Sequence, residues 1–485
     1  MKKQLKNYYH LGILGLMLGL ALSALAQSDL QQNAVGPSTP VVVQAADGTQ
    51  GTVAVVPQTW NVSFSGSQRT RYSRLNNQFR PGLDSNDEAL SLRTLLRVDA
   101  TRGPLSFVAE LQDSRSYLDD KNSALSTIEI NTLEPLQAYV GLRLDDVLTE
   151  DATLDLQLGR VTMDLGGRRL MARNRFRNTI QNYTGLTAHW TSPDKSELTT
   201  FFVLPVSVRP ADREGLQDND IELDAEDRDL RFWGLFYERP NFLTDITAEF
   251  YVFGLDESDD PRETQTRDRE LYTPGFRLIR EPSRGGWDID FENTLQFGSR
   301  RATSSISDTR TLDVFAHFHH LAVGYVFTHP WLPRLSMEYD FGSGEGDTNN
   351  GNYGRFDSLF GPRRAEFGPT GIYGILGREN IHSLGLRMTV IPGTRSDAFI
   401  SWRANYLDKA RDSFARSGLR DPAGNAGKFA GHQIEWHARY WLLPNKLRLE
   451  VGGAVFLQGG FLKHAPNANG EGDPLHVYTD LTYSF

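Results

Sequence analysis

The final eleven residues, 475–485, read LHVYTDLTYSF and end on the aromatic residue Phe485. Side chains along a β-strand point alternately to its two faces. One face of this stretch would be largely apolar, with Leu475, Val477, Thr479, Leu481 and Tyr483. The other would be polar, with His476, Tyr478, Asp480, Thr482 and Ser484. This pattern is typical of a strand that separates lipid from an aqueous lumen in a transmembrane β-barrel, although the edge strand of a soluble β-sandwich would also show it.

The same alternation recurs along the chain, and this regularity favours the barrel. It begins at Trp60, continues to Tyr72 and returns in a second run at about residues 90–100. Further strands are expected at about 104–114, 133–144, 152–160, 180–191, 197–206, 229–239, 245–255, 271–281, 286–298, 311–327, 334–342, 380–391, 395–407, 429–442, 445–457 and 474–485. The sequence therefore predicts an all-β fold, a single antiparallel transmembrane barrel of about 18 strands of the outer-membrane type. A terminal Phe on the last strand resembles the closing signal of bacterial outer-membrane proteins.

Short and long connections alternate between these strands. Short turns such as Pro392-Gly393 and Pro444-Asn445 follow every second strand. Long polar segments follow the others, at about 74–88, 115–132, 161–179, 207–228, 256–270, 299–310, 343–379, 408–428 and 458–473. Bacterial barrels have short periplasmic turns and longer extracellular loops, so the connections support the same fold.

The composition agrees with a barrel rather than a bundle of membrane helices. Of 485 residues, 39% are hydrophobic, and the mean hydropathy is -0.43. A barrel alternates its apolar residues and so averages polar, whereas membrane helices need about 20 consecutive apolar residues. The chain has no Cys, which excludes disulfides and thiolate metal sites.

The N-terminus reads as an export signal. Lys2, Lys3 and Lys6 precede the apolar run 11–22, and Ala24-Leu25-Ala26 supplies a small-residue cleavage site. We expect residues 1–26 to be a signal peptide cleaved near Ala26, residues 27–58 a periplasmic leader with a hairpin around Asp47-Gly48, and residues 59–485 the barrel. Cleavage removes three Lys and no acid, which changes the formal charge from -10 to -13. An exported acidic chain does not fit a nucleic-acid-binding role.

One stretch departs from the acidic character of the chain. Residues 158–184, LGRVTMDLGGRRLMARNRFRNTIQNYT, contain six Arg and the single acid Asp164. This segment follows a strand, so it would emerge at the extracellular mouth or fold back into the lumen. Guanidinium groups are permanently charged and weakly hydrated, and they bind carboxylates bidentately. Such a row in a wide pore would favour a polyanion, and the alternative is a surface loop that binds anionic lipopolysaccharide or neutralises acidic loops.

Four stretches resemble the alginate-export family of outer-membrane barrels. They are GRVTMDLGGRRLMARNRFRNT, the preceding PLQAYVGLRL, the loop GSGEGDTNNGNYGRFDSLFGPRRAEFG and the late GHQIEWHARYWL. The resemblance covers most of residues 60–485. It implies an eighteen-stranded barrel with an arginine-lined, electropositive channel that passes an anionic uronate polysaccharide outwards. Val161 follows Gly159-Arg160 where the family pattern usually has Gln.

Strand parity and the Arg-rich stretch together define the predicted pore lining, the candidate substrate-binding residues. These are Arg69, Arg71, Arg93, Arg97, Arg143, Arg160, Arg168, Arg169, Arg173, Arg175, Arg177, Arg387, Arg403 and Arg439. Strand parity also predicts that several acids face inward, among them Asp99, Glu110, Asp155, Asp288, Asp290, Glu292, Glu338, Glu435 and Glu450. Some of these charges must neutralise each other. Arg448 and Glu450 are expected to face Arg439 and Glu435 on the neighbouring strand.

Other polar clusters give weaker signals. The acidic loop 217–229 and the segment around Asp347 offer oxygen ligands for Ca²⁺, but a solvated loop explains them more simply. His317 and His319 share a strand face, but the sequence supplies no third ligand near them, so no metal site is predicted. Catalytic motifs with a local signature are absent from the sequence, and we predict neither enzymatic activity nor a cofactor.

These observations favour an outer-membrane channel for an anionic, alginate-like polysaccharide. An uptake porin for small carboxylates or sugar acids would use the same arginine chemistry. An outer-membrane enzyme, or an adhesin acting through loop 343–379, are the remaining alternatives. The expected partners are anionic polysaccharide or small organic anions, outer-membrane lipid and possible periplasmic export proteins, with no nucleic acid.

Overall fold

The computed structural model describes residues 41–44, 50–53 and 59–485, except residue 121, residues 260–264, and residues 306 and 363. The chain divides into two units, Met1–Thr59 and Trp60–Phe485. In the first, β1 (Val41–Gln44) pairs antiparallel with β2 (Gln50–Val53), consistent with the expected hairpin. The predicted signal peptide, residues 1–26, and the remainder of the leader lie outside the described residues.

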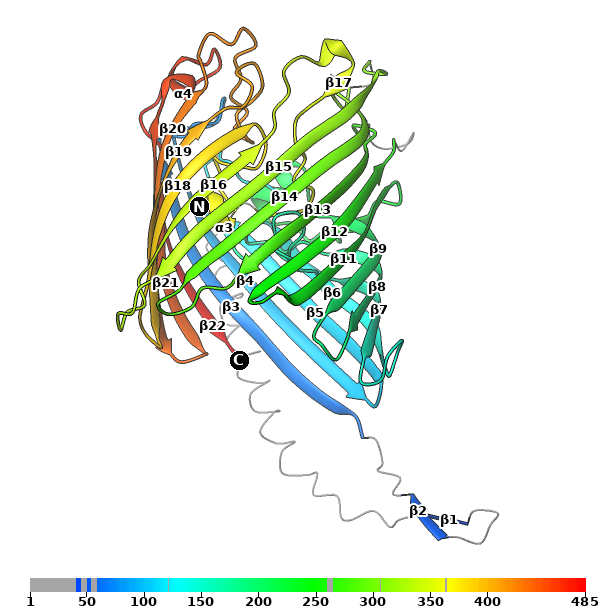
Figure 1. Ribbon diagram of the computed structural model, residues 1–485. Coiled ribbons are helices and arrows are strands. Elements are labelled where there is room, and N and C mark those ends of the chain that lie inside the picture. The colour runs from blue at the N-terminus through cyan, green and yellow to red at the C-terminus, as the bar shows by residue number, and fades with distance from the viewer. Residues whose placement is uncertain are drawn as a thin grey trace. The chain divides into compact units, whose positions relative to one another are not determined.

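The second unit is a closed antiparallel β-barrel of 18 strands, which confirms the predicted fold class (Figure 1). The wall consists of β3 (Asn61–Asn76), β4 (Asn86–Arg102), β5 (Leu105–Tyr117), β6 (Asn131–Asp145), β7 (Thr153–Val161), β8 (Tyr183–Thr191), β9 (Glu197–Ser207), β11 (Leu230–Leu243), β12 (Ile246–Glu257), β13 (Glu270–Arg280), β14 (Trp287–Arg301), β15 (Thr311–Val326), β16 (Arg334–Gly342), β18 (Ile381–Gly393), β19 (Ser396–Tyr406), β20 (Phe429–Leu443), β21 (Leu447–Gln458) and β22 (Leu475–Ser484). Each strand pairs with its neighbour in the chain, and β22 pairs with β3 to close the ring.

Short elements lie in the long connections. They are the strands β10 (Ala225–Glu226) and β17 (Asn352–Tyr353), the helices α2 (Arg213–Asp218), α3 (Arg364–Phe367) and α4 (Gly460–His464), and the 3-10 turn Thr348–Asn350. The long connections gather at one end of the barrel and the short turns at the other, as the sequence predicted (Figure 1). No helix among the described residues has the length and apolar character needed to cross a membrane.

The alternation read from the last strand is present in β22. Its apolar positions, from Leu475 to Tyr483, are exposed on the outside of the barrel, while His476, Tyr478 and Asp480 are buried on the inside. Asp480 lies opposite Arg71 of β3. Outward apolar residues recur around the ring, for example Phe64, Phe202 and Ile400, and they form the surface that faces lipid.

The chain end completes the ring. The backbone of Phe485 exchanges two hydrogen bonds with Gly66 of β3, at 2.9 and 3.1 Å. A Cβ atom on Gly66 would lie 2.6 Å from the Phe485 ring, so the ring needs a glycine at this position. The terminal aromatic residue thus packs against the first strand at the seam of the barrel.

The inner wall is apolar over one sector, which strand parity did not indicate. Phe201 on β9, Phe232 on β11 and Phe253 on β12 point inward and are buried together. They contact residues of two long connections that fold into the lumen. The parity assignment missed this sector because an inward residue is polar only where water, rather than a folded loop, lies against it.

Candidate functional site

The connection between β7 and β8, residues 162–182, is called here the inner loop because it folds into the barrel. Arg173 donates a hydrogen bond to Glu110 on β5 at 2.5 Å, and Arg169 donates one to Glu292 on β14 at 2.6 Å. β5 and β14 stand on nearly opposite sides of the ring. Of the two positions that the sequence left open, the mouth and the lumen, the loop therefore occupies the lumen.

The connection between β16 and β18, residues 343–380, also turns inward and is called the second loop. The amide of Phe360 donates to the carbonyl of Leu170 at 3.0 Å, so the second loop docks on the inner loop. A Cβ on Gly361 would lie 1.6 Å from the Arg169 carbonyl oxygen, and only glycine permits this approach. Farther on, Tyr373 donates to Gln433 of β20 at 2.8 Å. The two loops together occupy part of the lumen.

Apolar contacts fix the inner loop as firmly as its charges do. Met163, Leu170 and Met171 are buried in a cluster with Phe232 and Phe318 of the inner wall. Burial of each such side chain contributes roughly 1.5–3 kcal/mol. The sequence LMAR at 170–173 thus serves as an anchor between charged residues.

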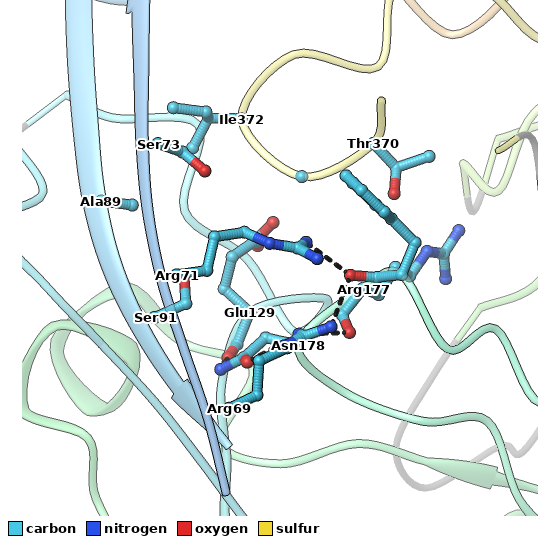
Figure 2. Close-up of a pocket in the computed structure, with 12 residues that line it drawn as sticks. Arg69, Arg71, Ser73, Ala89, Ser91, Glu129, Arg177, Asn178, Thr370 and Ile372 are labelled. Atoms are coloured by element: carbon cyan, nitrogen blue, oxygen red, sulfur yellow. Dashed lines mark hydrogen bonds between the residues drawn. The ribbon is translucent and has the colours of Figure 1, made fainter. Parts of the chain in front are cut away.

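Three arginines of the barrel wall hold the backbone of the inner loop, and Figure 2 shows two of them, Arg69 and Arg71. Arg69 donates to the carbonyls of residues 175, 176 and 177 at 3.0, 3.1 and 2.8 Å. Arg93 donates to the carbonyls of residues 175 and 177 at 3.1 and 2.9 Å. Arg71 donates to the carbonyl of residue 176 and to Asp480, at 2.6 and 2.7 Å. All three are buried, so they act as a clamp on the loop.

Phe176, at the centre of this clamp, lies between two guanidinium groups. Arg71 is 3.9 Å from the ring centroid, and Arg364 of the second loop is 4.6 Å from it. Tyr478 of β22 meets the same ring edge-on at 5.4 Å. Cation–π contacts that are shielded from water contribute about 2 kcal/mol. Phe176 therefore links the wall, the inner loop and the second loop.

Arg169 is the most heavily neutralised arginine of the inner loop. It donates to Asp290 at 2.9 Å, Glu292 at 2.6 Å and Glu366 at 2.9 Å, and its side chain is 4% exposed. Glu366 belongs to the second loop and also accepts from Arg378. Arg169 thus stabilises the junction of both loops with β14 and offers no free charge to a solute.

Most of the remaining predicted site residues are also paired with carboxylates. The pairs are Arg97–Asp99 at 2.6 Å, Arg160–Glu226 at 2.7 Å, Arg173–Glu110 at 2.5 Å, Arg387–Glu338 at 2.9 Å, Arg403–Asp340 at 2.7 Å and Arg439–Asp397 at 2.7 Å. Arg439 lies opposite Glu450 in the strand register, as expected. The expected position of Glu435 was wrong, since it lies opposite Ala454 and accepts from Arg364 of the second loop.

Three predicted residues keep more than half of the side chain exposed. Arg143, near the turn end, is 56% exposed and lies 3.5 Å from Asp145 and 3.8 Å from Asp155. Arg168 and Arg175 on the inner loop are 57% and 69% exposed, and both approach Asp164, at 3.9 and 3.4 Å. Two cations share one acid here. Arg168 and Arg175 therefore leave one positive charge uncompensated on a loop that spans the lumen.

A small cavity lies behind the inner loop (Figure 2). It is lined by Arg69, Arg71, Ser73, Ala89, Ser91, Glu129, Phe176, Arg177, Asn178, Thr370, Gly371 and Ile372. Burial raises the pKa of Glu129 to about 7, although hydrogen bonds from Ser126 oppose this shift. Burial also lowers the pKa of Arg177 to about 10, with Arg416 acting in the same direction. The cavity thus collects charged groups that are shielded from bulk water.

Sequence reasoning missed the contribution of the second loop. Arg364, Glu366 and Arg378 all contact the inner loop or the wall, but none was a predicted site residue. The run GPRRAEFG at 361–368 repeats the Arg-rich character of the inner loop and could have indicated them. Phe356, Phe367 and Tyr373 are buried, so much of this connection is unavailable as an outward adhesive loop.

The histidines singled out in the sequence lie on the outer wall. His317 and His319 hydrogen-bond to each other at 2.8 Å. Among the residues that the structure describes, no group of three or more His, Asp and Glu side chains is arranged to hold a metal ion. In the acidic loop 217–229, Asp224 accepts from the amide of Arg209 and from Asn131, both at 2.8 Å.

Solved structures similar to this one include three Occ proteins. Acinetobacter baumannii OccAB1 has a TM-score of 0.55 and 12% identity, over 87% of this chain and 97% of that chain. Pseudomonas aeruginosa OccK9 (OpdG) has a TM-score of 0.54 and 14% identity, over 88% and 98%. P. aeruginosa OccK8 (OprE) has a TM-score of 0.53 and 12% identity, over 88% and 98%. At these identities the likeness establishes the barrel fold alone.

Sequence comparison adds the family. No curated protein matches the sequence. The model of the alginate export family matches residues 60–473, which is nearly the whole barrel unit. This match confirms the resemblance that the Arg-rich stretch indicated. Together with the closed barrel, it indicates an outer-membrane channel, and the chain belongs to the alginate export family.

Proposed function

We propose that this channel passes anionic solutes, and in particular an alginate-like uronate polysaccharide, across the outer membrane without any chemical step. The observation that carries the proposal is the pair Arg168 and Arg175, exposed on the inner loop and sharing the single acid Asp164. A solute carboxylate can exchange with Asp164 at these guanidinium groups. Exchange among weak sites lets a polymer advance without being trapped.

The paired arginines support transport in a different way. Their carboxylate partners remove net charge from the wall, so a passing polyanion meets few deep electrostatic wells there. Arg143 at the turn end is also exposed, but it lies between two acids, Asp145 and Asp155. The selectivity of the channel therefore depends on a few exposed cations rather than on the total number of arginines.

The test is single-channel recording of the purified, folded chain in a planar bilayer. Replacing Arg168 and Arg175 with Gln should lower the anion-to-cation permeability ratio and weaken block by added oligouronate by about ten-fold, the loss of roughly one charge-assisted hydrogen bond. Arg231→Gln is the matched control, because Arg231 carries the same charge on the outer wall at the loop end and is half exposed. Unchanged block in the double variant would contradict the proposal.

Uptake of small carboxylates or sugar acids is the second candidate. The docked inner and second loops occupy part of the lumen, and a narrow passage suits small solutes. Comparison of block by a monomeric uronate with block by a long oligouronate separates the two candidates. Dwell times that increase with oligomer length favour passage of the polymer. Equal block by the monomer and the oligomer at the same molar concentration favours uptake of small solutes.

Delivery to the outer membrane would follow export of the full chain and cleavage near Ala26. Mass measurement of the membrane-inserted protein tests this step, since an N-terminus at Gln27 is expected. Polymer export would also require periplasmic proteins that deliver the polysaccharide to the turn end of the barrel.

A further inference from the structure

A cluster of polar and aromatic side chains interrupts the lipid-facing surface across β14, β15, β16 and β18. It consists of Asn293, His317, His319, Phe341 and His382 and is called here the imidazole patch. These residues point outward, since Phe318 and His320, which alternate with the two β15 histidines, are buried inside. Phe315, two residues from His317 on the same face, is 65% exposed. The patch therefore belongs to the wall that faces lipid.

The patch is held together by a chain of hydrogen bonds. The Asn293 side-chain amide lies 2.9 Å from His319 Nδ1, and His319 Nε2 lies 2.8 Å from His317 Nδ1. The amide nitrogen of Asn293 can only donate, so His319 Nδ1 accepts and His319 Nε2 carries the proton. His317 Nδ1 then accepts as well. This order leaves the proton of His317 on Nε2, where it is available to a ligand outside the protein.

Neighbouring groups fix the rest of the patch. The rings of His317 and Phe341 stack at 4.9 Å, and Phe341 meets His382 at 4.5 Å. His382 Nδ1 hydrogen-bonds to the hydroxyl of Tyr339 at 2.9 Å, and His382 Nε2 lies 3.8 Å from Asp408. Lys409 lies 3.5 Å from Asp408 and is about half exposed. The Lys409 ammonium therefore lies beside Asp408 at the His382 end of the patch.

The position of the patch near the boundary between lipid hydrocarbon and headgroups determines which ligand can bind it. His317 lies next to Phe315, and Phe315 pairs across the sheet with Phe297 of β14. On β18, His382 is the second residue from the loop end and lies opposite Tyr406. Aromatic rows of this kind mark the boundary between hydrocarbon and headgroups. A hydrogen-bond donor that faces pure hydrocarbon costs free energy, whereas at this boundary a headgroup oxygen can accept from it.

We propose that the imidazole patch binds the phosphate-bearing headgroup of a lipid in the leaflet at the loop end. His317 Nε2 and the Lys409 ammonium supply the donors for the phosphate oxygens. The complementarity is between two donors on the protein and an anionic acceptor on the lipid. The proposal is independent of what passes through the lumen.

Native mass spectrometry of the full folded chain, released from detergent with added lipid A, tests the proposal. His317→Phe and Lys409→Gln should each reduce retention of the phosphorylated lipid by about ten-fold, the loss of roughly one charge-assisted hydrogen bond. Dephosphorylated lipid A should be retained equally weakly by all variants. His432→Phe is the matched control, since His432 also faces outward on β20 but stacks on Trp402 outside this hydrogen-bonded chain.

Heat-modifiable gel migration shows that each variant is folded before it is compared. Equal retention of phosphorylated and dephosphorylated lipid by the wild-type chain would overturn the proposal. So would a second copy of the chain cross-linked through residue 317 in place of lipid, because the patch would then be an interface between protomers.

Discussion

At the scale of single residues, the structure separates arginines that bind protein from arginines that remain available. Arg69, Arg93 and Arg169 are buried and donate hydrogen bonds to carbonyls or carboxylates. Arg175 has one partner at 3.4 Å and is mostly exposed. Residue type alone does not distinguish these four side chains, because all of them are arginines and carry the same charge.

Arg169→Gln should destabilise the junction of the two loops. The change leaves Asp290, Glu292 and Glu366 buried without their common cation, and loss of one partner of a buried ion pair costs about 3–5 kcal/mol. We expect a lower midpoint of unfolding in urea and noisier single-channel currents. Arg175→Gln serves as control and should leave the midpoint within about 0.5 kcal/mol, as exposed pairs contribute little. Equal midpoints for both variants would refute the role of Arg169.

Glu129 should make stability depend on pH. Its carboxyl lies in the connection 118–130, and burial raises its pKa from 4.5 to about 7. A raised pKa means that the fold favours the neutral form, so this contribution is complete below about pH 4.5 and is lost as the pH rises through about 7. The difference is on the order of 3 kcal/mol.

Unfolding midpoints at pH 5 and pH 8 test this expectation. The wild-type chain should lose more stability between the two values than Glu129→Gln, whose amide does not titrate. The groups around Glu129 that also carry charge, Arg80 and Arg177, stay protonated over this range. An identical pH dependence in the two proteins would exclude Glu129 as its source.

At the scale of elements, the inner loop is positioned by both its own anchor residues and the wall behind it. Arg69 and Arg93 face each other across β3 and β4, a like-charge pair that is unfavourable in an empty barrel. The carbonyls of residues 175–177 compensate this repulsion. The wall and the loop therefore stabilise each other.

Arg93→Gln should release the inner loop from the wall. The variant loses two hydrogen bonds from a charged donor, roughly 1.5–3 kcal/mol each. We expect a higher mean conductance with more frequent transitions, because the loop would sample positions away from the lumen axis.

Arg97→Gln is the control for this experiment. Arg97 is on the same strand and the same inward face, but it pairs with Asp99 rather than with the loop. If both variants raised the conductance equally, loss of lumen charge, rather than release of the loop, would explain the change.

At the scale of the whole molecule, barrel closure depends on the seam between β22 and β3. Gly66→Ala places a Cβ 2.5 Å from the Leu95 carbonyl oxygen and 2.6 Å from the Phe485 ring. Overpacking of this kind costs about 1–3 kcal/mol, so the urea midpoint and the yield of folded barrel should fall. Gly393→Ala is the control, since a Cβ at that position meets no atom within 4 Å. Equal stability of the two variants would argue against the seam.

The sequence by itself determined the class of fold. Period-two alternation, short and long connections in turn and the terminal Phe485 predicted 18 antiparallel strands, and no predicted strand bound differs from the structure by more than four residues. These features are local, because each depends on neighbouring residues in the chain and on the lipid that surrounds the barrel. The inward position of Arg69, Arg93 and Arg403 followed from the same parity.

Only the tertiary structure decided which of these charges are free. Arg169 meets acids from β14 and the second loop, more than 100 residues away in the chain, and Arg93 meets carbonyls of the inner loop. The part of the inner wall around Phe232 can be apolar because the two loops cover it. Contacts between distant segments depend on how two long connections pack within one closed wall, and the alternation of residues along a strand carries no information about that packing.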